Sequence, residues 1–423
     1  MLTLQLIRTE TEKVKQGLQK KHFKEINVVD EILAMDEKRR NIQQQNDAVL
    51  AQQNNAAKQI GALMKDGKKE EAEQLKLQVA DWKKQTEQLK QDLEATEKQQ
   101  HDLLVKLPNM PHSSVPEGKT PEENVVVFQV ATIPTLPQDA LPHWELTTKY
   151  NLIDFELGVK LTGAGFPVYK NKGAKLQRAL IAYFLDKATE AGYMEFMPPL
   201  LVNAESGYGT GQLPDKEGQM YHCTVDDFYL IPTAEVPVTN IYRDTIVKEE
   251  DLPIKMTAYT PCFRREAGSY GKDVRGLNRL HQFDKVEIVQ IEHPDKSYAT
   301  LDTMVKHVEN LLQELELPYR ILRLCGGDMS FASALTFDFE VWSAAQKRWL
   351  EVSSTSCFES FQTNRMKCRF KDANGKMQFA HSLNGSALAL PRIVASLLEN
   401  NQTPDGIKLP KVLHKYFGAE MIN

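Results

Sequence analysis

Charged and aromatic residues alternate along segment 260–287 in a pattern that could serve chemistry. Arg264 and Glu266 are two residues apart, so an extended strand would direct both side chains to one face. After a polar loop that contains glycines, a second strand would place three more side chains on one face, namely Phe283, Lys285 and Glu287. A surface ion pair accounts for any single pair of these residues. It does not account for an aromatic ring and charges of both signs together, so we interpret the segment as a binding hairpin.

Two further motifs occur in a fixed order around this hairpin. Segment 191–199 (AGYMEFMPP) precedes it, and segment 383–392 (LNGSALALPR) follows it. With the hairpin as the second motif, the chain resembles the class II aminoacyl-tRNA synthetases and, within them, the seryl-tRNA synthetases of the bacterial type. Either outer motif alone would recur by chance, whereas their order and spacing around the hairpin are specific. The resemblance covers essentially the whole chain.

The resemblance implies an ATP-dependent ligase that works in two steps. The carboxylate of L-serine attacks the α-phosphorus of ATP and expels pyrophosphate, and the seryl-adenylate then passes serine to the 3′ end of tRNA(Ser). In a host that has it, tRNA(Sec) is expected as a second acceptor. Phosphoryl transfer needs positive charge where negative charge develops. Arginine suits this role because its planar, permanently charged fork binds oxygens in pairs.

The resemblance also assigns residues to ATP and Mg²⁺. Arg264 is expected to contact the α-phosphate and Arg392 the outer phosphates, while Phe283 stacks on adenine. Glu351 and Ser354 match positions that hold Mg²⁺, and oxygen ligands suit an ion that bridges phosphates. We expect Arg264, Arg392 and Glu351 to be catalytic. The complete expected ATP set is Arg264, Arg265, Glu266 (beside the base), Phe283, Glu351, Val352, Ser353, Ser354 and Arg392.

The run Thr233-Ala234-Glu235 resembles the amino acid site of the family. On a strand, Thr233 and Glu235 would face the same way, and a carboxylate suits the α-ammonium group of serine. Alone, this tripeptide would fit an ordinary edge strand. The remaining expected serine contacts are Glu287, Asn384 and Ser386. A site that hydrogen-bonds the serine hydroxyl rejects alanine by roughly 10⁴-fold, whereas threonine must be excluded by lack of space.

Four residues depart from the pattern of the family. Ala387 replaces a glycine in the third motif, Cys357 an asparagine, and Leu335 a lysine. Pro391 precedes the motif arginine and is tolerable only in the first turn of a helix. None of the four removes an expected phosphate, Mg²⁺ or serine contact, so we expect effects on rate or local packing.

Residues 28–107 are nearly free of proline and aromatic residues and rich in Lys, Glu, Gln, Leu and Ala, which indicates long helices. Segment 75–107 repeats a 4-3 spacing of seam positions, whereas the first half has a polar column that includes Arg39 and Asn46. A reversal within 61–69 predicts an antiparallel coiled-coil hairpin with arms on the order of 50–60 Å long.

The hairpin has two possible roles from its sequence. It could be an oligomerisation coiled coil, or lysines near its tip could meet RNA phosphates, although a solvated charged face explains the same lysines: Lys58, Lys65, Lys68 and Lys69. The resemblance implies that the hairpin lies across the long extra arm of serine tRNA, often the tRNA of the partner subunit.

After a proline-rich connector, the chain takes a mixed α and β pattern. Four runs predict strands, and one predicts an amphipathic helix: 229–238, 254–264, 283–291 and 337–352, and 297–315. Short turns separate the strands, which favours an antiparallel sheet and an α+β fold. We expect an N-terminal tRNA-binding domain over residues 1–110, with its hairpin at about 28–107, and a class II catalytic domain over 111–423. The resemblance implies a homodimer.

Composition narrows the function class. A length of 423 residues favours two domains, and a net charge of −5 argues against RNA binding by counterion release alone. Five scattered cysteines without a CxxC motif indicate neither a disulfide framework nor a zinc site. No apolar run is long enough to span a membrane, and no secretory signal is visible, so we expect a cytoplasmic protein.

Two rival functions remain open. A relative that charges a carrier protein instead of tRNA is expected to lack the hairpin arm. A non-catalytic RNA-binding paralogue is expected to have lost several of the charged residues that are present here: Arg264, Glu266, Glu287, Glu351 and Arg392.

Overall fold

The computed structural model describes residues 1–130, 132–137, 139–215, 218–266 and 275–423. These residues form two compact units. The first comprises Met1–Gln19 and Phe23–Pro108, and the second comprises Lys20–His22 and Asn109–Asn423. The glycine-containing loop of the predicted binding hairpin falls largely on 267–274, outside the described residues. No helix within the described ranges has both the length and the apolar character needed to cross a bilayer.

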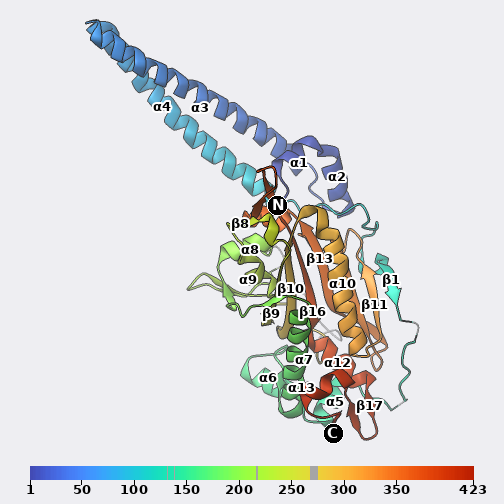
Figure 1. The fold of residues 1–423 in the computed structure, drawn as a ribbon. Helices are drawn as coiled ribbons and strands as arrows, with labels where there is room; N and C mark the ends of the chain where they lie inside the picture. The colour runs from blue at the N-terminus through green and yellow to red at the C-terminus, as the bar shows by residue number, and fades with distance from the viewer. Residues whose placement is uncertain (131, 138, 216–217, 267–274) are drawn as a thin grey trace. The chain divides into compact units, whose positions relative to one another are not determined.

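In the first unit, α3 (Val28–Lys65) and α4 (Lys69–Leu104) lie side by side (Figure 1). The chain reverses at 66–68, where Gly67 has a φ of 78°, a conformation that favours glycine. The helical hairpin is therefore confirmed. The reversal is shorter than predicted, because Gly61 lies inside α3. Two short helices, α1 (Leu4–Thr9) and α2 (Thr11–Lys20), precede the hairpin.

The seam between α3 and α4 mixes apolar and polar side chains. Val49 on α3 and Leu89 on α4 are buried, and so are Asn46 and Thr86. Gln53 donates a hydrogen bond of 2.6 Å to the Thr86 hydroxyl across the seam. Polar pairs at such positions fix the register of two helices at some cost in stability.

A buried carboxylate joins α1 to the hairpin. Asp36 on α3 is 0% exposed and accepts hydrogen bonds from Arg8, at 2.6 Å from Nε and 2.5 Å from Nη2. Arg39 and Arg40 approach the same carboxylate at 3.7 and 3.2 Å, and Gln100 on α4 donates to it at 3.5 Å. Burial raises the pKa of Asp36, but these partners outweigh burial and hold the pKa below its usual value.

The second unit is built on an eight-stranded sheet whose neighbouring strands are antiparallel, except for the parallel edge pair β9–β4. In spatial order the strands are β1 (Val125–Gln129), β11 (Tyr319–Arg323), β12 (Leu335–Ser343), β13 (Arg348–Glu359), β16 (His381–Ala389), β10 (Gln282–Glu292), β9 (Ile254–Phe263) and β4 (Met194–Glu195). The predicted antiparallel sheet is therefore confirmed.

Helices α7 (Asn171–Glu190), α10 (Ser297–Glu314) and α12 (Leu390–Asn400) share one large hydrophobic core with the sheet (Figure 1). On β10, Val286 and Ile288 belong to this core. Because strand side chains alternate, Lys285 and Glu287 point to the opposite face of the sheet, which we call the site face.

Lys20–His22 belongs to the second unit although its neighbours in sequence belong to the first. The Lys21 ammonium donates hydrogen bonds to the backbone carbonyls of Ser330, Phe331 and Ser333, at 2.8, 3.4 and 2.7 Å. This lysine therefore adds a donor to three carbonyls of one loop, of which the Phe331 carbonyl also accepts the Asn109 backbone N–H at 2.9 Å.

Three of the predicted strand runs differ from the structure in where strands begin or end. Run 337–352 is two strands, β12 and β13, with a turn at 344–347. Run 229–238 ends as β7 (Phe228–Leu230) and continues as helix α9 (Glu235–Asn240), because Pro232 and Pro237 cannot donate to a ladder. Run 254–264 ends one residue early, at Phe263. The helix at 297–315 is confirmed as α10.

Candidate active site

The register of the sheet places predicted serine contacts together. Glu287 on β10 pairs with Ser386 on β16, and Val289 pairs with Asn384. Cross-strand partners point to the same face, and so do residues two apart on one strand. Glu287, Ser386 and Asn384 therefore all lie on the site face.

A β-bulge brings the two predicted Mg²⁺ ligands to this face as well. Glu351 and Ser354 are three residues apart, and on a regular strand they would point in opposite directions. In the β12–β13 ladder, however, Asp338 pairs with Ser354 and Glu340 with Glu351, so β13 spends one extra residue here. Phe339, between the two acids of β12, lies in the helix-covered core. Both acids, and with them Glu351 and Ser354, therefore lie on the site face.

Thr233 and Glu235 reach the same place without lying on a strand, which corrects the prediction. The Thr233 hydroxyl donates to Glu287 Oε2 at 3.2 Å and accepts from the Glu235 backbone N–H at 3.2 Å. This second bond supports the start of α9, and buried Ala234 lies between the two residues. Lys285 Nζ lies 2.5 Å from Glu287 Oε2, which balances that buried carboxylate.

The surroundings of Glu235 shift the pKa of its carboxyl group. Its burial, and after that the nearby Glu287 carboxylate, raises the pKa of Glu235 to about 7, although hydrogen bonds from Gln362 and Asn384 lower it. Gln362 on α11 (Phe361–Met366) donates to Glu235 Oε1 at 2.6 Å. Because Ser382 donates to the Gln362 carbonyl oxygen at 2.7 Å, the Gln362 amide must present its N–H to Glu235.

Arg264 and Glu266 follow β9 and do not lie on a strand as predicted, and Glu266 has a φ of 46°. Arg264 Nε donates to the Pro232 carbonyl at 3.2 Å, and its guanidinium carbon lies 5.3 Å from the centre of the Phe283 ring. Glu266 pairs with Arg279 at 2.8 Å. The expected α-phosphate ligand and the expected adenine platform are thus in contact, although the strand geometry was wrong.

Arg392 lies in the first turn of α12, and Pro391 occupies the first turn too, as the sequence required. Its Nη1 donates to the Glu351 carbonyl at 2.7 Å, and its Nε donates to the Asn278 carbonyl at 3.1 Å. Burial lowers the pKa of Arg392, but a guanidinium remains charged at any physiological pH. Two backbone acceptors therefore fix the direction of this arginine.

The other predicted ATP residues differ in position. Arg265 is exposed, and its backbone N–H donates to the Gln219 carbonyl at 2.9 Å. The Val352 side chain lies in the helix-covered core, so it is not part of the site face. Ser353 donates to the Ser386 carbonyl at 2.6 Å and ties β13 to β16.

Three of the four departures from the family pattern lie on the other side of the sheet. Leu335 pairs with Cys357 across β12 and β13, and both side chains are buried in the helix-covered core together with Ala387. These three residues therefore contribute to packing and not to the site face.

Two residues of the site were missed from the sequence. Gln362, which orients Glu235, lies in a run without any periodic signal. Asp338 is half-buried beside Glu351 and Ser354, and its buried Oδ1 has no hydrogen-bond partner within the described residues. Burial, and then the Glu351 carboxylate, raises the pKa of Asp338 well above its usual value. The sequence signal that could have revealed Asp338 is its spacing: it lies two residues before Glu340, so a strand directs both acids to one face.

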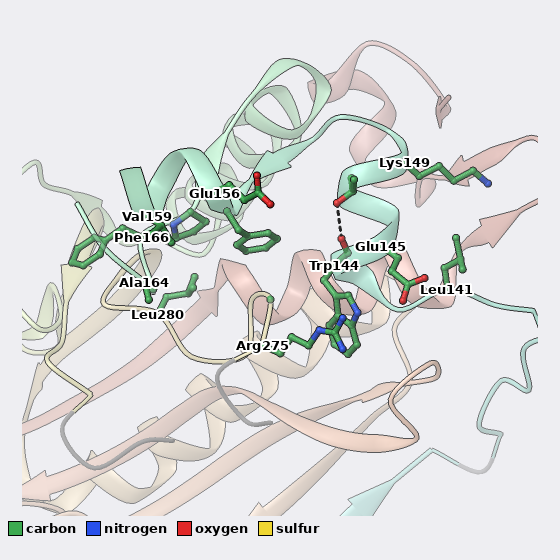
Figure 2. Close-up of a pocket in the computed structure, with 15 residues that line it drawn as sticks. Leu141, Trp144, Glu145, Lys149, Glu156, Val159, Ala164, Phe166, Arg275 and Leu280 are labelled. Atoms are coloured by element: carbon green, nitrogen blue, oxygen red, sulfur yellow. Dashed lines mark hydrogen bonds between the residues drawn. The ribbon is translucent and has the colours of Figure 1, made fainter. Parts of the chain in front are cut away.

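A cavity of about 880 Å³ opens beside α5 (His143–Lys149) and α6 (Phe155–Leu161) (Figure 2). Its lining includes Trp144, Phe155, Phe166, Arg275 and Leu280, but none of the residues expected to bind ATP or serine. The Arg275 guanidinium carbon lies 4.6 Å from the centre of the Trp144 ring. The cavity is thus distinct from the site face. Segment 275–281 contributes Arg275, Gly276 and Leu280 to its lining.

Comparisons with known proteins identify the family of the chain. Residues 1–111 match the family model described as the seryl-tRNA synthetase N-terminal domain, and residues 221–401 match that of the class II tRNA synthetase core domain (G, H, P, S and T). A serine–tRNA ligase of Salinibacter ruber is 51% identical, over 100% of this chain and 99% of that protein. The chain belongs to the seryl-tRNA synthetase family.

Other members of the family agree over the same length. A serine–tRNA ligase of Akkermansia muciniphila is 46% identical over 100% of this chain and 99% of that protein. The solved seryl-tRNA synthetase of Pyrococcus horikoshii, complexed with ATP, superposes with a TM-score of 0.94 at 32% identity, covering 100% of this chain and 99% of that one. The cytoplasmic enzyme of Naegleria fowleri, in complex with AMP, gives 0.90 at 26% identity with the same coverage.

Proposed function

We propose that the protein is a serine–tRNA ligase that activates L-serine with ATP and transfers the seryl group to tRNA(Ser). One observation supports this above all: residues from four strands and three flanking segments converge on one face of the sheet. Glu287, Asn384 and Ser386 face serine there, with Glu235 beside them, while Arg264 and Arg392 supply positive charge for the phosphates. Family membership over the full length supports the same reaction.

Each residue has a defined task in this proposal. Glu235 and Thr233 bind the α-ammonium group, and Glu287 with Ser386 binds the hydroxyl. Phe283 stacks on adenine, with Glu266 beside the base. Arg264 stabilises the charge that develops on the α-phosphate as the serine carboxylate attacks, and Arg392 binds the outer phosphates as pyrophosphate leaves.

The donor set around Glu351 fits Mg²⁺. Within the described residues, no group of three or more His, Cys, Asp or Glu could hold a metal by itself. Mg²⁺ does not need such a cage, because it is usually held by one or two carboxylates plus phosphates. Glu351 and Ser354 would hold it, with the unpaired Asp338 Oδ1 beside them. The ion would neutralise phosphate charge. ATP–pyrophosphate exchange should therefore be lost in EDTA and recover when Mg²⁺ is added.

The helical hairpin is proposed to bind the long extra arm of tRNA(Ser). Exposed lysines near the reversal at 66–68 support this by offering phosphate contacts: Lys58, Lys65, Lys68 and Lys69. Where a host has tRNA(Sec), the same contacts would serve it. Because tRNA charging supplies translation and all five cysteines are free thiols, we place the reaction in the cytoplasm.

A homodimer is proposed through the surface around β4. Met194, Met197 and Leu201 are 65, 92 and 45% exposed, which is costly for large apolar side chains unless a partner covers them. Sedimentation should give twice the mass of the chain, and Met197→Asp should yield the monomer.

The test of the function itself uses two assays in sequence. ATP–pyrophosphate exchange should depend on serine and should not respond to alanine. Charging of bulk tRNA with labelled serine should follow. Exchange without charging would point to a different acceptor, such as a carrier protein, and the absence of both would refute the proposal.

A further inference from the structure

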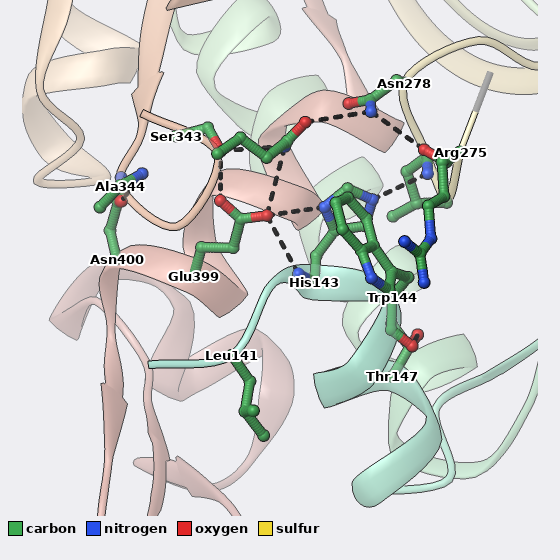
Figure 3. A network of polar contacts seen from close by, with 12 residues as sticks. Leu141, His143, Trp144, Thr147, Arg275, Asn278, Ser343, Ala344, Glu399 and Asn400 are labelled. Carbon is green, nitrogen blue, oxygen red and sulfur yellow. Dashed lines mark hydrogen bonds and ion pairs between the residues drawn. The ribbon is translucent and has the colours of Figure 1, made fainter. Parts of the chain in front are cut away.

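A buried carboxylate outside the site face anchors a polar network (Figure 3). Glu399 on α12 is 0% exposed. Its Oε1 accepts from the backbone N–H and Nδ1 of His143 at 3.0 and 2.7 Å, and from Gln346 Nε2 at 3.2 Å, while Ser343 donates to Oε2. Burial alone would raise the pKa of Glu399, but these bonds outweigh it and hold the pKa below its usual value. The carboxylate is therefore a fixed acceptor.

The protonation of His143 follows from its two partners. Nε2 of this buried ring accepts the backbone N–H of Leu277 at 2.9 Å, so Nε2 carries no proton. The proton must then lie on Nδ1, where it is donated to Glu399. Glu399 thus selects the one tautomer that can hold Leu277.

The chain is closely fitted to the His143 ring at the neighbouring residue. Gly276 has a φ of 66°, and a Cβ at this position would come within 2.3 Å of His143 Nε2. Arg275 is held from the same helix by the ring of Trp144. Helix α5 therefore contacts three consecutive residues of the chain, Arg275, Gly276 and Leu277.

The segment held by α5 contacts Arg392, an expected ATP ligand of the proposed reaction. Asn278 follows Leu277, and its side chain donates to the Arg275 carbonyl at 2.9 Å and to Gln346 Oε1 at 3.1 Å. Its backbone carbonyl accepts Arg392 Nε. The second acceptor of Arg392 is the carbonyl of Glu351, which a central strand holds rigidly. Segment 275–281 does not lie on a strand, so its position depends on its contacts with α5.

We infer that His143 and Glu399 are positioning residues: through the Leu277 N–H and the Asn278 carbonyl, they orient Arg392 for the outer phosphates of ATP. This inference rests on the proposed function for the identity of the nucleotide. Arginine side chains lose considerable rotamer freedom on binding, and a guanidinium held in advance binds phosphate with less of that loss. Glu399 lies seven residues after Arg392 on α12, so one helix fixes both ends of the network.

Two substitutions at His143 separate this role from a purely structural one. In His143→Gln, the amide oxygen can replace Nε2 and still accept from Leu277, but the bond to Glu399 is lost. In His143→Asn, the amide nitrogen can replace Nδ1 and still donate to Glu399, but the side chain is too short to reach Leu277. We expect His143→Asn to weaken binding of a non-hydrolysable ATP analogue by about five- to tenfold, measured by calorimetry, with His143→Gln within about twofold of wild type.

Three controls complete the experiment. Tyr183→Phe removes a hydrogen bond of 3.1 Å to Glu314 elsewhere in the core and should lower the melting temperature without changing analogue affinity. Gly276→Ala should reproduce the loss seen in His143→Asn, because its Cβ displaces the ring. In serine-dependent exchange, the KM for ATP should rise and the KM for serine should not.

The inference is overturned if His143→Asn binds the analogue like wild type, or if affinity falls in proportion to melting temperature in all variants, Tyr183→Phe included. Equal rises of both KM values would also overturn it. Wild-type protein that binds the analogue but shows no serine-dependent exchange would refute the proposed function, while the affinity comparison would still decide the inference.

Discussion

Glu235 has a pKa of about 7, raised first by burial and then by Glu287, so it gains its charge as the pH rises through neutrality. The ammonium group of serine is already positive below that pH, and the ionised carboxylate is the form that binds it. Between about pH 5.5 and pH 7, serine affinity should therefore rise by up to about tenfold per pH unit and then level off. Calorimetric titration of serine across this range measures it.

The matched variant for this prediction is Glu235→Gln. It keeps the shape of the side chain but cannot ionise, so its weaker serine binding should be flat over the same range. A wild-type affinity that does not change with pH would mean that Glu235 is ionised throughout or does not touch the ammonium group.

Arg264 offers a second test at the level of one side chain. Arg264→Ala should slow ATP–pyrophosphate exchange by about 10²-fold or more, because it removes a contact to charge that develops during the reaction. Arg264→Lys keeps the charge without the fork and should fall between the two. Exchange at a near-normal rate in Arg264→Ala would remove this residue from the phosphate site.

Residue identities were the most predictable part of the site, because each carries a chemical signature. Arg264 and Phe283 were expected on one surface and are in contact, and Phe283 and Glu287 lie on the same face of β10. Asp338 and Gln362 were not expected, since a single acid or amide in a strand or helix has no signature until its neighbours in space are known.

The elements show where the sequence stops being informative. Strand alternation predicted the shared face of Phe283, Lys285 and Glu287 on β10 correctly, because a period of two is visible in the residues themselves. Strand ends were misjudged at Thr233–Glu235, after β7, and at Arg264–Glu266, after β9, since caps and turns decide them and not periodicity. The bulge that unites Glu351 with Ser354 was equally invisible, because it depends on the register against β12.

Asp36 yields a prediction at the scale of the helices. Asp36→Asn removes the charge that Arg8, Arg39 and Arg40 share and should destabilise the packing of α1 on the hairpin by about 1–3 kcal/mol. Amide hydrogen exchange should then be faster at the adjoining ends of α3 and α4. The control is Asp47→Asn, because Asp47 is exposed and accepts a hydrogen bond from Gln43 in the same helix. Equal exchange in both variants would show that the Asp36 cluster stabilises nothing.

For the whole molecule, the central prediction separates adenylate formation from tRNA charging. Removing residues 30–105 deletes the helical hairpin but none of the site face, so serine-dependent pyrophosphate exchange should stay within a few-fold of wild type. The efficiency of tRNA charging should fall by about a hundredfold or more, which corresponds to roughly 3 kcal/mol of lost tRNA binding. Loss of both activities together would mean that the tRNA-binding element has been misplaced.

Lys21 determines how such an experiment should be designed. Its ammonium satisfies three carbonyls of the second unit from a short stretch near the start of the chain. A fragment that begins at Asn109 would discard this donor. The Phe331 and Ser330 carbonyls would keep their bonds from Asn109 and Ser333, but the Ser333 carbonyl would lose its 2.7 Å partner. The chain can therefore be shortened by removing the helical hairpin internally. Removing the first residues as well would also remove Lys21, which donates to the second unit.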